Sequence, residues 1–319
     1  MNRREFIVLA GSLLASPAPF AQAKPVRIGV LAPLKRPPAL PAILKRLGEL
    51  GFVEGNNLSV EIRSTDGVAE RSPALARELV QAGCNLIFAY GTEQGARALM
   101  QATASVPIVI LAIDYDPLEV GIVKSLGRPG GNVTGIYIPN AMLAAKRLEL
   151  LRETLPGTKR VLALVDPYTT EQLKVTHKAA AQLGMEIVTA PFTAPPYDFE
   201  AAFEKGRAAR VEALLLFSSP VFFEQRARIS QLVSARRLPA MAVTASYIDS
   251  IMMSYGANAY KTFERAGDMA ANILKGANPG DIAVEQAAVF EFVVSLKAAK
   301  ALGVKIPQAV LLRADRVIE

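Results

Sequence analysis

The sequence predicts an α/β protein of two doubly wound parallel-sheet lobes, with helices on both faces of each sheet and crossover segments that join the lobes as hinges. Three observations predict this class. Apolar, β-branched runs alternate with helical stretches from residue 26 to residue 244. The alternation is too long for one open sheet, and it restarts near residues 136–142. Of the 319 residues, 51% are hydrophobic and 20% are charged, which supplies ample apolar material for a core.

The first half of the pattern begins with "VRIGVLA" at 26–32, a continuous apolar run typical of a strand that is covered on both faces. Pro73 suits the first turn of a helix, and Gly83 suits the end of the same helix. The strands expected in this half are 26–32, 57–65, 85–90, 106–113 and 132–138, and the expected helices are 40–52, 72–83, 92–103 and 117–127.

The second half repeats the same alternation. Its apolar runs "RVLALV" and "EALLLFSS" are again followed by stretches with helical spacing. The strands expected here are 160–165, 185–190, 212–219 and 238–244, and the expected helices are 144–157, 170–184, 199–210 and 221–237.

The first 23 residues have the pattern of a secretory signal. "MNRREF" is a short positive start, an apolar stretch of 15 residues follows, and "AQA" places small residues at a cleavage site. A membrane span needs about 20 apolar residues, so a membrane anchor is not expected. The pair Arg3-Arg4 resembles a twin-arginine export signal, and a plain Sec signal remains the alternative. The mature protein would begin at Lys24.

Composition and charge exclude several classes of function. The net charge of +7 is spread along the chain rather than clustered, so we do not expect nucleic-acid binding. The single cysteine, Cys84, cannot form an intrachain disulfide, and the single histidine, His177, lies in a polar helical stretch. No Cys/His metal cluster and no cofactor are therefore expected.

The glycine-rich stretch "GRPGGNVTG" at 127–135 invites comparison with a phosphate-binding loop. It matches neither G-x-x-x-x-G-K-[ST] nor G-x-G-x-x-G, and it precedes a strand, whereas phosphate loops precede a helix. We expect Gly127 to end a helix, Pro129 to prevent its continuation, and Gly130-Gly131 to turn the chain into the strand at 132–138.

Five segments of the chain together resemble one family of substrate-binding proteins of ABC transporters. The family includes amino-acid-type and uncharacterised members with the type I periplasmic-binding fold. The segments are "LGELGFVEGNNLSVEIRSTDG" at 47–67, "LGRPGGNVTGI" at 126–136, "LPGTKRVLALVDP" at 155–167, "LPAMAVTASYIDSIMMSYGAN" at 238–258, and residues 290–319. The resemblance runs from about Lys24 to Glu319.

The resemblance implies a two-lobed ligand trap that delivers a small molecule to an ABC permease in the inner membrane, which works with a cytoplasmic ATPase. The N-terminal lobe would comprise residues 24–138 and about 247–282. The C-terminal lobe would comprise residues 139–246 and about 283–319. A periplasmic monomer without a lipid anchor is expected.

Ligands of open parallel sheets bind beyond the carboxyl ends of the strands, where helix N-termini offer free N–H groups. The candidates of the first lobe are Ala32, Leu34, Gly91, Thr92, Glu93, Gln94, Asp114 and Asp116. Thr92 either contacts a ligand or caps its helix, and the two roles are compatible. A carboxylate of Asp114 or Asp116 suits an ammonium group, and the alternative for Asp116 is a helix start before Pro117.

The candidates of the second lobe are Asp166, Tyr168, Thr169, Ser218, Ser219 and Tyr247. The first three follow the strand at 160–165 and could close over the ligand. Ser219 precedes Pro220, so it is also a good helix cap. Tyr247 lies near the return crossover and could stack on an apolar or aromatic ligand.

Three functions are compatible with these features. The first is capture of a small molecule, such as an amino acid or a small carboxylate, by hinge closure and without catalysis. The second is a periplasmic α/β enzyme that uses Asp114 and Asp116 as an acid/base pair. The third is a sensory protein that presents its ligand to a membrane receptor. Since no nucleophile or metal motif accompanies the carboxylates, we expect the protein not to be an enzyme.

Overall fold

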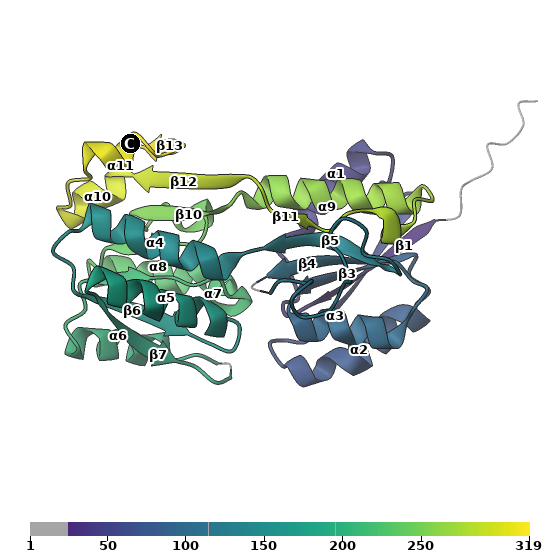
Figure 1. The fold of residues 1–319 in the computed structure, drawn as a ribbon, viewed down its shortest axis with the longest axis horizontal. Coiled ribbons are helices and arrows are strands. Elements are labelled where there is room, and N and C mark those ends of the chain that lie inside the picture. The colour runs from purple at the N-terminus through teal and green to yellow at the C-terminus, as the bar shows by residue number, and fades with distance from the viewer. Residues whose placement is uncertain (1–24, 114, 195) are drawn as a thin grey trace, which may run out of the picture.

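The computed structural model describes residues 25–113, 115–194 and 196–319, so the expected signal at residues 1–23 lies outside the described residues. The chain forms two lobes that lie end to end along the long axis of the molecule (Figure 1). Each lobe is a sheet with helices on both faces, which confirms the predicted class. Among the described residues, no helix is long and apolar enough to cross a membrane.

The N-terminal lobe contains a parallel sheet in the order β11-β5-β4-β3-β1-β2. Its strands are β1 Val26–Ala32, β2 Leu58–Ser64, β3 Leu86–Gly91, β4 Ile108–Ile113, β5 Val133–Ile138 and β11 Glu285–Gln286. Its α-helices are α1 Leu40–Glu49, α2 Ser72–Gln81, α3 Glu93–Ala102 and α9 Ala259–Leu274. Helices α1 and α9 pack on one face of the sheet, and α2 and α3 pack on the other.

The C-terminal lobe contains a sheet in the order β13-β12-β10-β9-β8-β6-β7, in which only the pair β10 and β12 is antiparallel. Its strands are β6 Arg160–Val165, β7 Glu186–Pro191, β8 Ala213–Leu215, β9 Ala240–Ala242, β10 Met253–Ala257, β12 Phe290–Ser295 and β13 Arg316–Ile318. Its helices are α4 Asn140–Thr154, α5 Thr170–Leu183, α6 Phe199–Ala208, α7 Pro220–Glu224, α8 Arg226–Ala235, α10 Leu296–Leu302 and α11 Gln308–Leu311. Helices α4 and α5 cover one face, and α6 to α8 cover the other.

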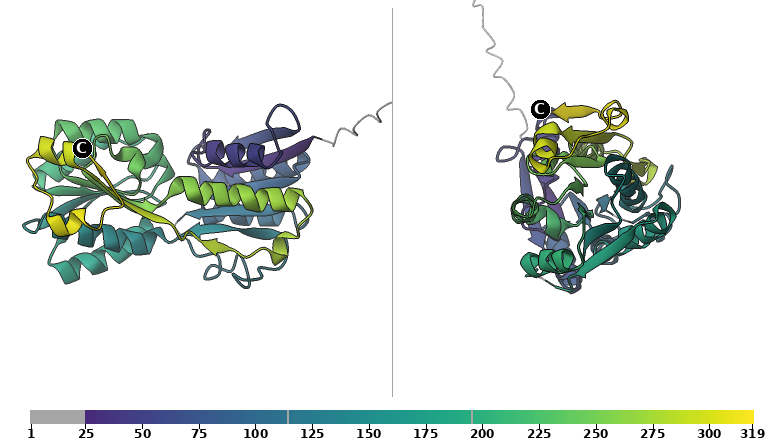
Figure 2. Two further views of the ribbon diagram at one scale, coloured as in Figure 1. Left: turned by 90° about the horizontal axis from the view of Figure 1, so that it is seen from above. Right: turned by 90° about the vertical axis from the view of Figure 1, so that its left-hand side faces the viewer.

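The chain crosses between the lobes three times. The crossovers lie between β5 and α4, between β10 and α9, and between β11 and β12. All three run through the narrow waist of the molecule, as the view from above shows (Figure 2). The expected crossover near residues 136–142 agrees with the first of them.

The predicted lobe boundaries in the last third of the chain are wrong. Residues 253–257 were expected in the N-terminal lobe, but β10 pairs with β9 and β12 of the C-terminal sheet. Residues 283–287 were expected in the C-terminal lobe, but β11 pairs with β5, and the N–H of Ala287 donates to the carbonyl of Tyr137 at 2.8 Å. The second crossover therefore follows residue 257, and the third lies between residues 286 and 290.

The predicted helix at 117–127 is also wrong, because this segment forms only turns. The carboxylate of Asp116 accepts hydrogen bonds from the N–H groups of Leu118 and Glu119 and starts one turn. Gly121 then has a φ of 71°, which ends the turn, so Gly127 has no helix to end. The expected turn at Gly130-Gly131 is present, with φ angles of 65° and 84°.

Candidate functional site

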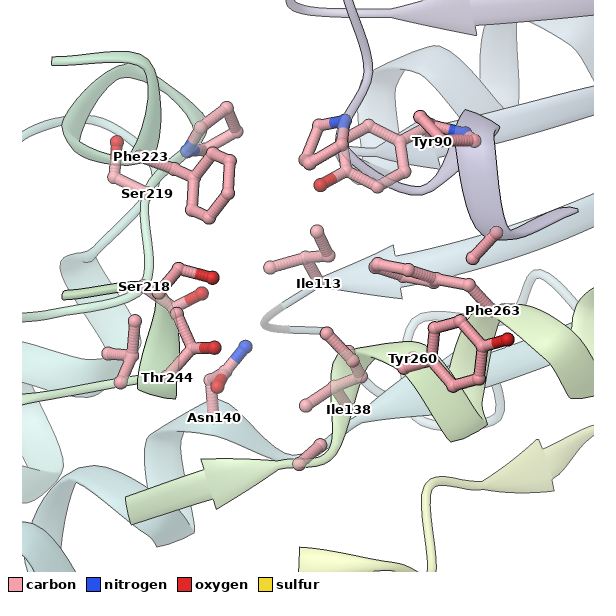
Figure 3. Close-up of a pocket in the computed structure, with 18 of the residues that line it drawn as sticks. Tyr90, Ile113, Ile138, Asn140, Ser218, Ser219, Phe223, Thr244, Tyr260 and Phe263 are labelled. Carbon is pink, nitrogen blue, oxygen red and sulfur yellow. The ribbon is translucent and has the colours of Figure 1, made fainter. Parts of the chain in front are cut away.

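A cavity of about 480 Å³ lies between the two lobes, beside the first two crossovers (Figure 3). This size lies within the usual range for small-molecule sites, about 300–1,000 Å³. The residues that line it are Pro38, Pro41, Ala42, Lys45, Tyr90, Ile113, Ile138, Asn140, Ser218, Ser219, Pro220, Phe223, Val243, Thr244, Ser246, Ala257, Ala259, Tyr260 and Phe263. We call it the main cavity.

The wall from the N-terminal lobe is aromatic and aliphatic. Tyr90 at the end of β3 and Phe263 on α9 meet edge to face, with ring centroids 6.4 Å apart. Tyr260 lies one turn before Phe263 on the same helix, and Ile113 and Ile138 end strands β4 and β5. Burial raises the pKa of Tyr90, so its hydroxyl stays neutral. This wall suits an apolar or aromatic group.

The wall from the C-terminal lobe is polar, and its described residues carry no charge. Ser218, Thr244 and Asn140 point into the space between the lobes (Figure 3). The side chain of Gln172 holds Ser218 in place, because its Oε1 accepts from the N–H of Ser218 at 2.8 Å and its Nε2 donates to the carbonyl at 2.9 Å. Phe223 of α7 adds one aromatic ring to this wall.

Of the described residues that line the main cavity, Lys45 is the one with a charge. Its Nζ donates to Glu49 Oε1 at 2.9 Å and to the hydroxyl of Tyr260 at 2.7 Å. The ammonium group is thus held at the rim between a carboxylate and a phenol. Hydroxyl and amide groups therefore provide most of the polar surface that a ligand would meet.

A second cavity of about 140 Å³ adjoins the main one and shares Ile113 and Pro220 with it. Its walls include Gly91, Thr92, Glu93 and Gln94 from the first lobe, and Pro167, Tyr168, Thr170 and Glu171 from the second. The hydroxyl of Thr92 accepts a hydrogen bond from the N–H of Gly95 at 3.2 Å, so Thr92 caps α3 while it lines this cavity. Glu93 is paired with Arg97 on the next turn of the helix.

A third cavity of about 450 Å³ lies between the lobes, where Leu34 and Gly67 of the first lobe face Tyr197 and Glu224 of the second. Tyr168 lies close to it, since the Tyr168 hydroxyl donates a hydrogen bond to the carbonyl of Gly67 at 3.1 Å. This bond joins the two lobes directly.

Asp166 organises the loop that carries Tyr168. One carboxylate oxygen accepts from the backbone N–H of Tyr168 at 3.0 Å, and the other accepts from the hydroxyl of Ser219 at 2.5 Å and that of Tyr197 at 3.5 Å. Asp166 is 3% exposed, and this burial raises the pKa of its carboxyl from 3.8 to about 6, against the opposing effect of these hydrogen bonds.

The structure places the predicted residues in three groups. The first group lines a cavity and comprises Leu34, Gly91, Thr92, Glu93, Gln94, Tyr168, Ser218 and Ser219. Ser219 also caps α7, because its hydroxyl accepts from the N–H groups of Val221 and Phe222. The second group comprises only Asp114, which lies outside the described residues.

The third group consists of residues that line none of the three cavities. Ala32 is buried in the apolar cluster beneath α1 and α9. Asp166 and Thr169 are buried and bond to each other, with the N–H of Asp166 donating to the Thr169 hydroxyl at 2.9 Å. Asp116 uses its carboxylate to form the turn at 117–121. Tyr247 packs edge to face behind Phe223, with centroids 6.4 Å apart, so it supports the wall and does not form it.

Sequence reasoning missed the residues that define the main cavity: Tyr90, Asn140, Phe223, Thr244, Tyr260 and Phe263. Most of them lie inside helices or strands, whereas the search was confined to loops after strands. Tyr90 gave one usable signal, because it is an aromatic residue at the carboxyl end of the aliphatic strand "NLIFAY".

Two lobes, three crossovers and a cleft with walls from both lobes define the class of bilobed binding proteins. The sequence profile of ABC transporter substrate binding proteins matches residues 27–318, so the chain belongs to this family. The resemblance noted in the sequence is thereby confirmed. Members of this family are binding proteins, so the chain is not an enzyme, and the acid/base role considered for Asp114 and Asp116 is set aside.

Several proteins are similar to this chain over most of its length. A tyrosine-binding protein from Clostridioides difficile is 24% identical over 266 residues, which are 82% of this chain and 75% of the relative. A conserved domain protein from Vibrio cholerae has a TM-score of 0.80 and 27% identity, covering 92% of this chain and all of the other. A Streptococcus pneumoniae ABC domain solved with L-Trp has a TM-score of 0.77 and 24% identity, covering 92% and 99%.

Proposed function

We propose that this chain captures an amino acid with an aromatic side chain in the periplasm and presents it to an ABC permease for import, driven by a cytoplasmic ATPase. One observation carries the proposal: the main cavity has an aromatic wall on one lobe and an uncharged polar wall on the other. A ligand with an apolar ring at one end and a polar head at the other satisfies both walls at once.

The composition of the cavities supports an aromatic amino acid over other small molecules. Tyr90, Phe263 and Phe223 offer ring faces and edges to an aromatic group. The adjoining second cavity is lined by the carboxylates Glu93 and Glu171. Each pairs with a basic residue of its own helix, and their oxygens offer acceptors to a ligand ammonium group.

Two relatives are consistent with this proposal. One is called a tyrosine-binding protein, and the other was solved in complex with L-Trp. The signal pattern at residues 1–23 supports export, and the match to substrate-binding proteins of ABC transporters supports a permease as the partner. Import and periplasmic location both belong to the proposal.

Isothermal titration calorimetry on the mature chain, refolded to remove any bound ligand, tests the ligand class. We expect L-Tyr, L-Trp or L-Phe to bind, and L-Glu, L-Lys and glucose to give no heat. Phe223→Ala removes a cavity ring whose burial is worth about 1.5–3 kcal/mol, so Kd should rise about tenfold to a hundredfold. Phe52→Ala is the matched control, because Phe52 is also half-buried and lies outside the three cavities.

Uptake of radiolabelled ligand by cells with and without this protein tests import. Failure of all aromatic amino acids to bind would refute the ligand class. Tight binding with unchanged uptake in the deletion strain would refute the import role and leave the binding function standing.

A further inference from the structure

Asn140 occupies a special position in the polar wall of the main cavity. It is the first residue of α4, directly after the first crossover, and it is 5% exposed. Its amide nitrogen points away from the C-terminal lobe and into the cavity, beside Thr244 and Ser218 (Figure 3). Among the described residues, no hydrogen bond uses this nitrogen as a donor, which leaves it available to a ligand.

The orientation of this amide follows from the residue behind it. Arg147, two turns further along α4, is fully buried, and its Nη2 donates to Asn140 Oδ1 at 3.3 Å. Its Nε donates to the carbonyl of Tyr255 on β10 at 2.7 Å, which anchors the guanidinium between two crossovers. A guanidinium carries donors only, so the amide atom that faces it must be the oxygen. The nitrogen is therefore fixed towards the cavity.

The surroundings of Asn140 favour an anionic acceptor. The hydroxyls of Ser218 and Thr244 can donate in the same region, and none of the described residues that line the main cavity carries a carboxylate. The N-terminus of the 15-residue helix α4 adds partial positive charge at this point, and the buried guanidinium polarises the amide further. A ligand carboxylate would satisfy these donors without a formal ion pair.

We propose that Asn140, oriented by Arg147, binds the carboxylate of the ligand and so selects free amino acids against amides and amines of the same ring. Asn140 is the specificity-determining residue, and Arg147 is a positioning residue that does not touch the ligand. This inference rests on the proposed function, since it assumes that an aromatic amino acid occupies the main cavity.

The test compares Kd for L-tyrosine, L-tyrosinamide and tyramine by calorimetry. A hydrogen bond to a charged group is worth about 1.5–3 kcal/mol, so wild type should prefer the acid over the amide by about tenfold to a hundredfold. Asn140→Asp keeps an oxygen for Arg147 but turns an acceptor towards the cavity. This substitution should abolish the preference for the acid over the amide, because it should weaken the affinity for L-tyrosine about a hundredfold. The affinity for tyramine should be unchanged or improved.

Asn258→Asp is the matched control. Asn258 caps α9 at the second crossover through its Oδ1, which an aspartate retains, and it does not line the main cavity. The ratio of its Kd for L-tyrosinamide to its Kd for L-tyrosine should equal the ratio of wild type. Arg147→Lys should lower the ratio without changing tyramine affinity. A loss of thermal stability with the ratio intact would refute its positioning role.

The outcomes separate the two proposals. If L-tyrosine and L-tyrosinamide bind wild type equally, or if Asn140→Asp keeps the acid preference, the carboxylate assignment is overturned while the proposed function stands. If no aromatic amino acid binds wild type, the proposed function fails, and the carboxylate assignment fails with it.

Discussion

Replacing Asp166 by Asn should change how the stability of the protein depends on pH. Burial raises the pKa of the Asp166 carboxyl from 3.8 to about 6, so ionising this group costs more in the folded chain than in the unfolded chain. At about 1.4 kcal/mol per pH unit, the difference amounts to about 3 kcal/mol. The whole cost is present above about pH 6, where the group is ionised in both states.

The sign of the effect is set by where the proton binds. As the pH falls from about 6 to about 4, the folded chain takes up a proton on Asp166 and the unfolded chain does not, so this group contributes increasing stability. Asp166→Asn cannot titrate. Its free energy of unfolding, relative to wild type, should therefore fall by most of this difference, about 2.5 kcal/mol, between about pH 7 and about pH 4.

Urea unfolding followed by far-UV circular dichroism measures this difference, since the chain has no tryptophan for fluorescence. Asp249→Asn is the control, because Asp249 is an exposed carboxylate of the same lobe. Its stability curve should run parallel to that of wild type. If the curve of Asp166→Asn also runs parallel to wild type over this range, the burial argument is refuted.

Three further predictions follow from other contacts. Tyr168→Phe removes the bond to the Gly67 carbonyl across the cleft, worth about 0.5–1.5 kcal/mol, so ligand Kd should rise about twofold to tenfold by calorimetry with the melting temperature unchanged. Gly135→Ala would place a Cβ 2.1 Å from a backbone oxygen of β4, so it should abolish soluble expression. Gly157→Ala is the control: Gly157 has open space around it, so this variant should express and melt like wild type. Cys84 is buried and its pKa is raised, so its thiol should react with a disulfide reagent only after denaturation; rapid labelling of the native chain would contradict this.

The alternation of strands and helices could be predicted because periodicity is a local property. Each buried strand of a parallel sheet gives an apolar run, and each covering helix gives a 3.6-residue pattern, regardless of the rest of the chain. The segment at 117–127 has an apolar pattern without being a helix. The conformation of this segment depends on the hydrogen bonds of the Asp116 side chain and on the left-handed φ of Gly121. Periodicity reveals neither of them.

Sheet membership could not be predicted in the same way. Strand β10 reads as an apolar run that fits either sheet, and its partners β9 and β12 lie 11 and 33 residues or more away along the chain. The predicted boundary at about residue 247 assumed that the chain returns to the first lobe as soon as β9 ends. The chain instead adds one more strand to the second sheet before it crosses at residues 257–259.

The sequence predicted those cleft residues whose position follows from the backbone of the sheet. It did not predict the residues whose role depends on the direction of their side chains. The loop at Gly91–Gln94 lies at the carboxyl end of a central strand, and any doubly wound sheet places such a loop at the cleft. Asp166 likewise follows the carboxyl end of a strand, β6, but its side chain turns inward to hold Tyr168 and Ser219. The sequence around Asp166 does not encode that direction in any local pattern.

The placement of the main cavity explains how a ligand would shift the balance between open and closed lobes. Tyr90 and Phe263 belong to one lobe, and Ser218 and Thr244 belong to the other, so an open arrangement separates the two walls. A ligand that touches both walls would gain its full set of contacts only with the lobes closed, and this difference in affinity would favour the closed arrangement. Asn140 lies on the first crossover itself, so a group bound there contacts the segment about which the lobes would turn.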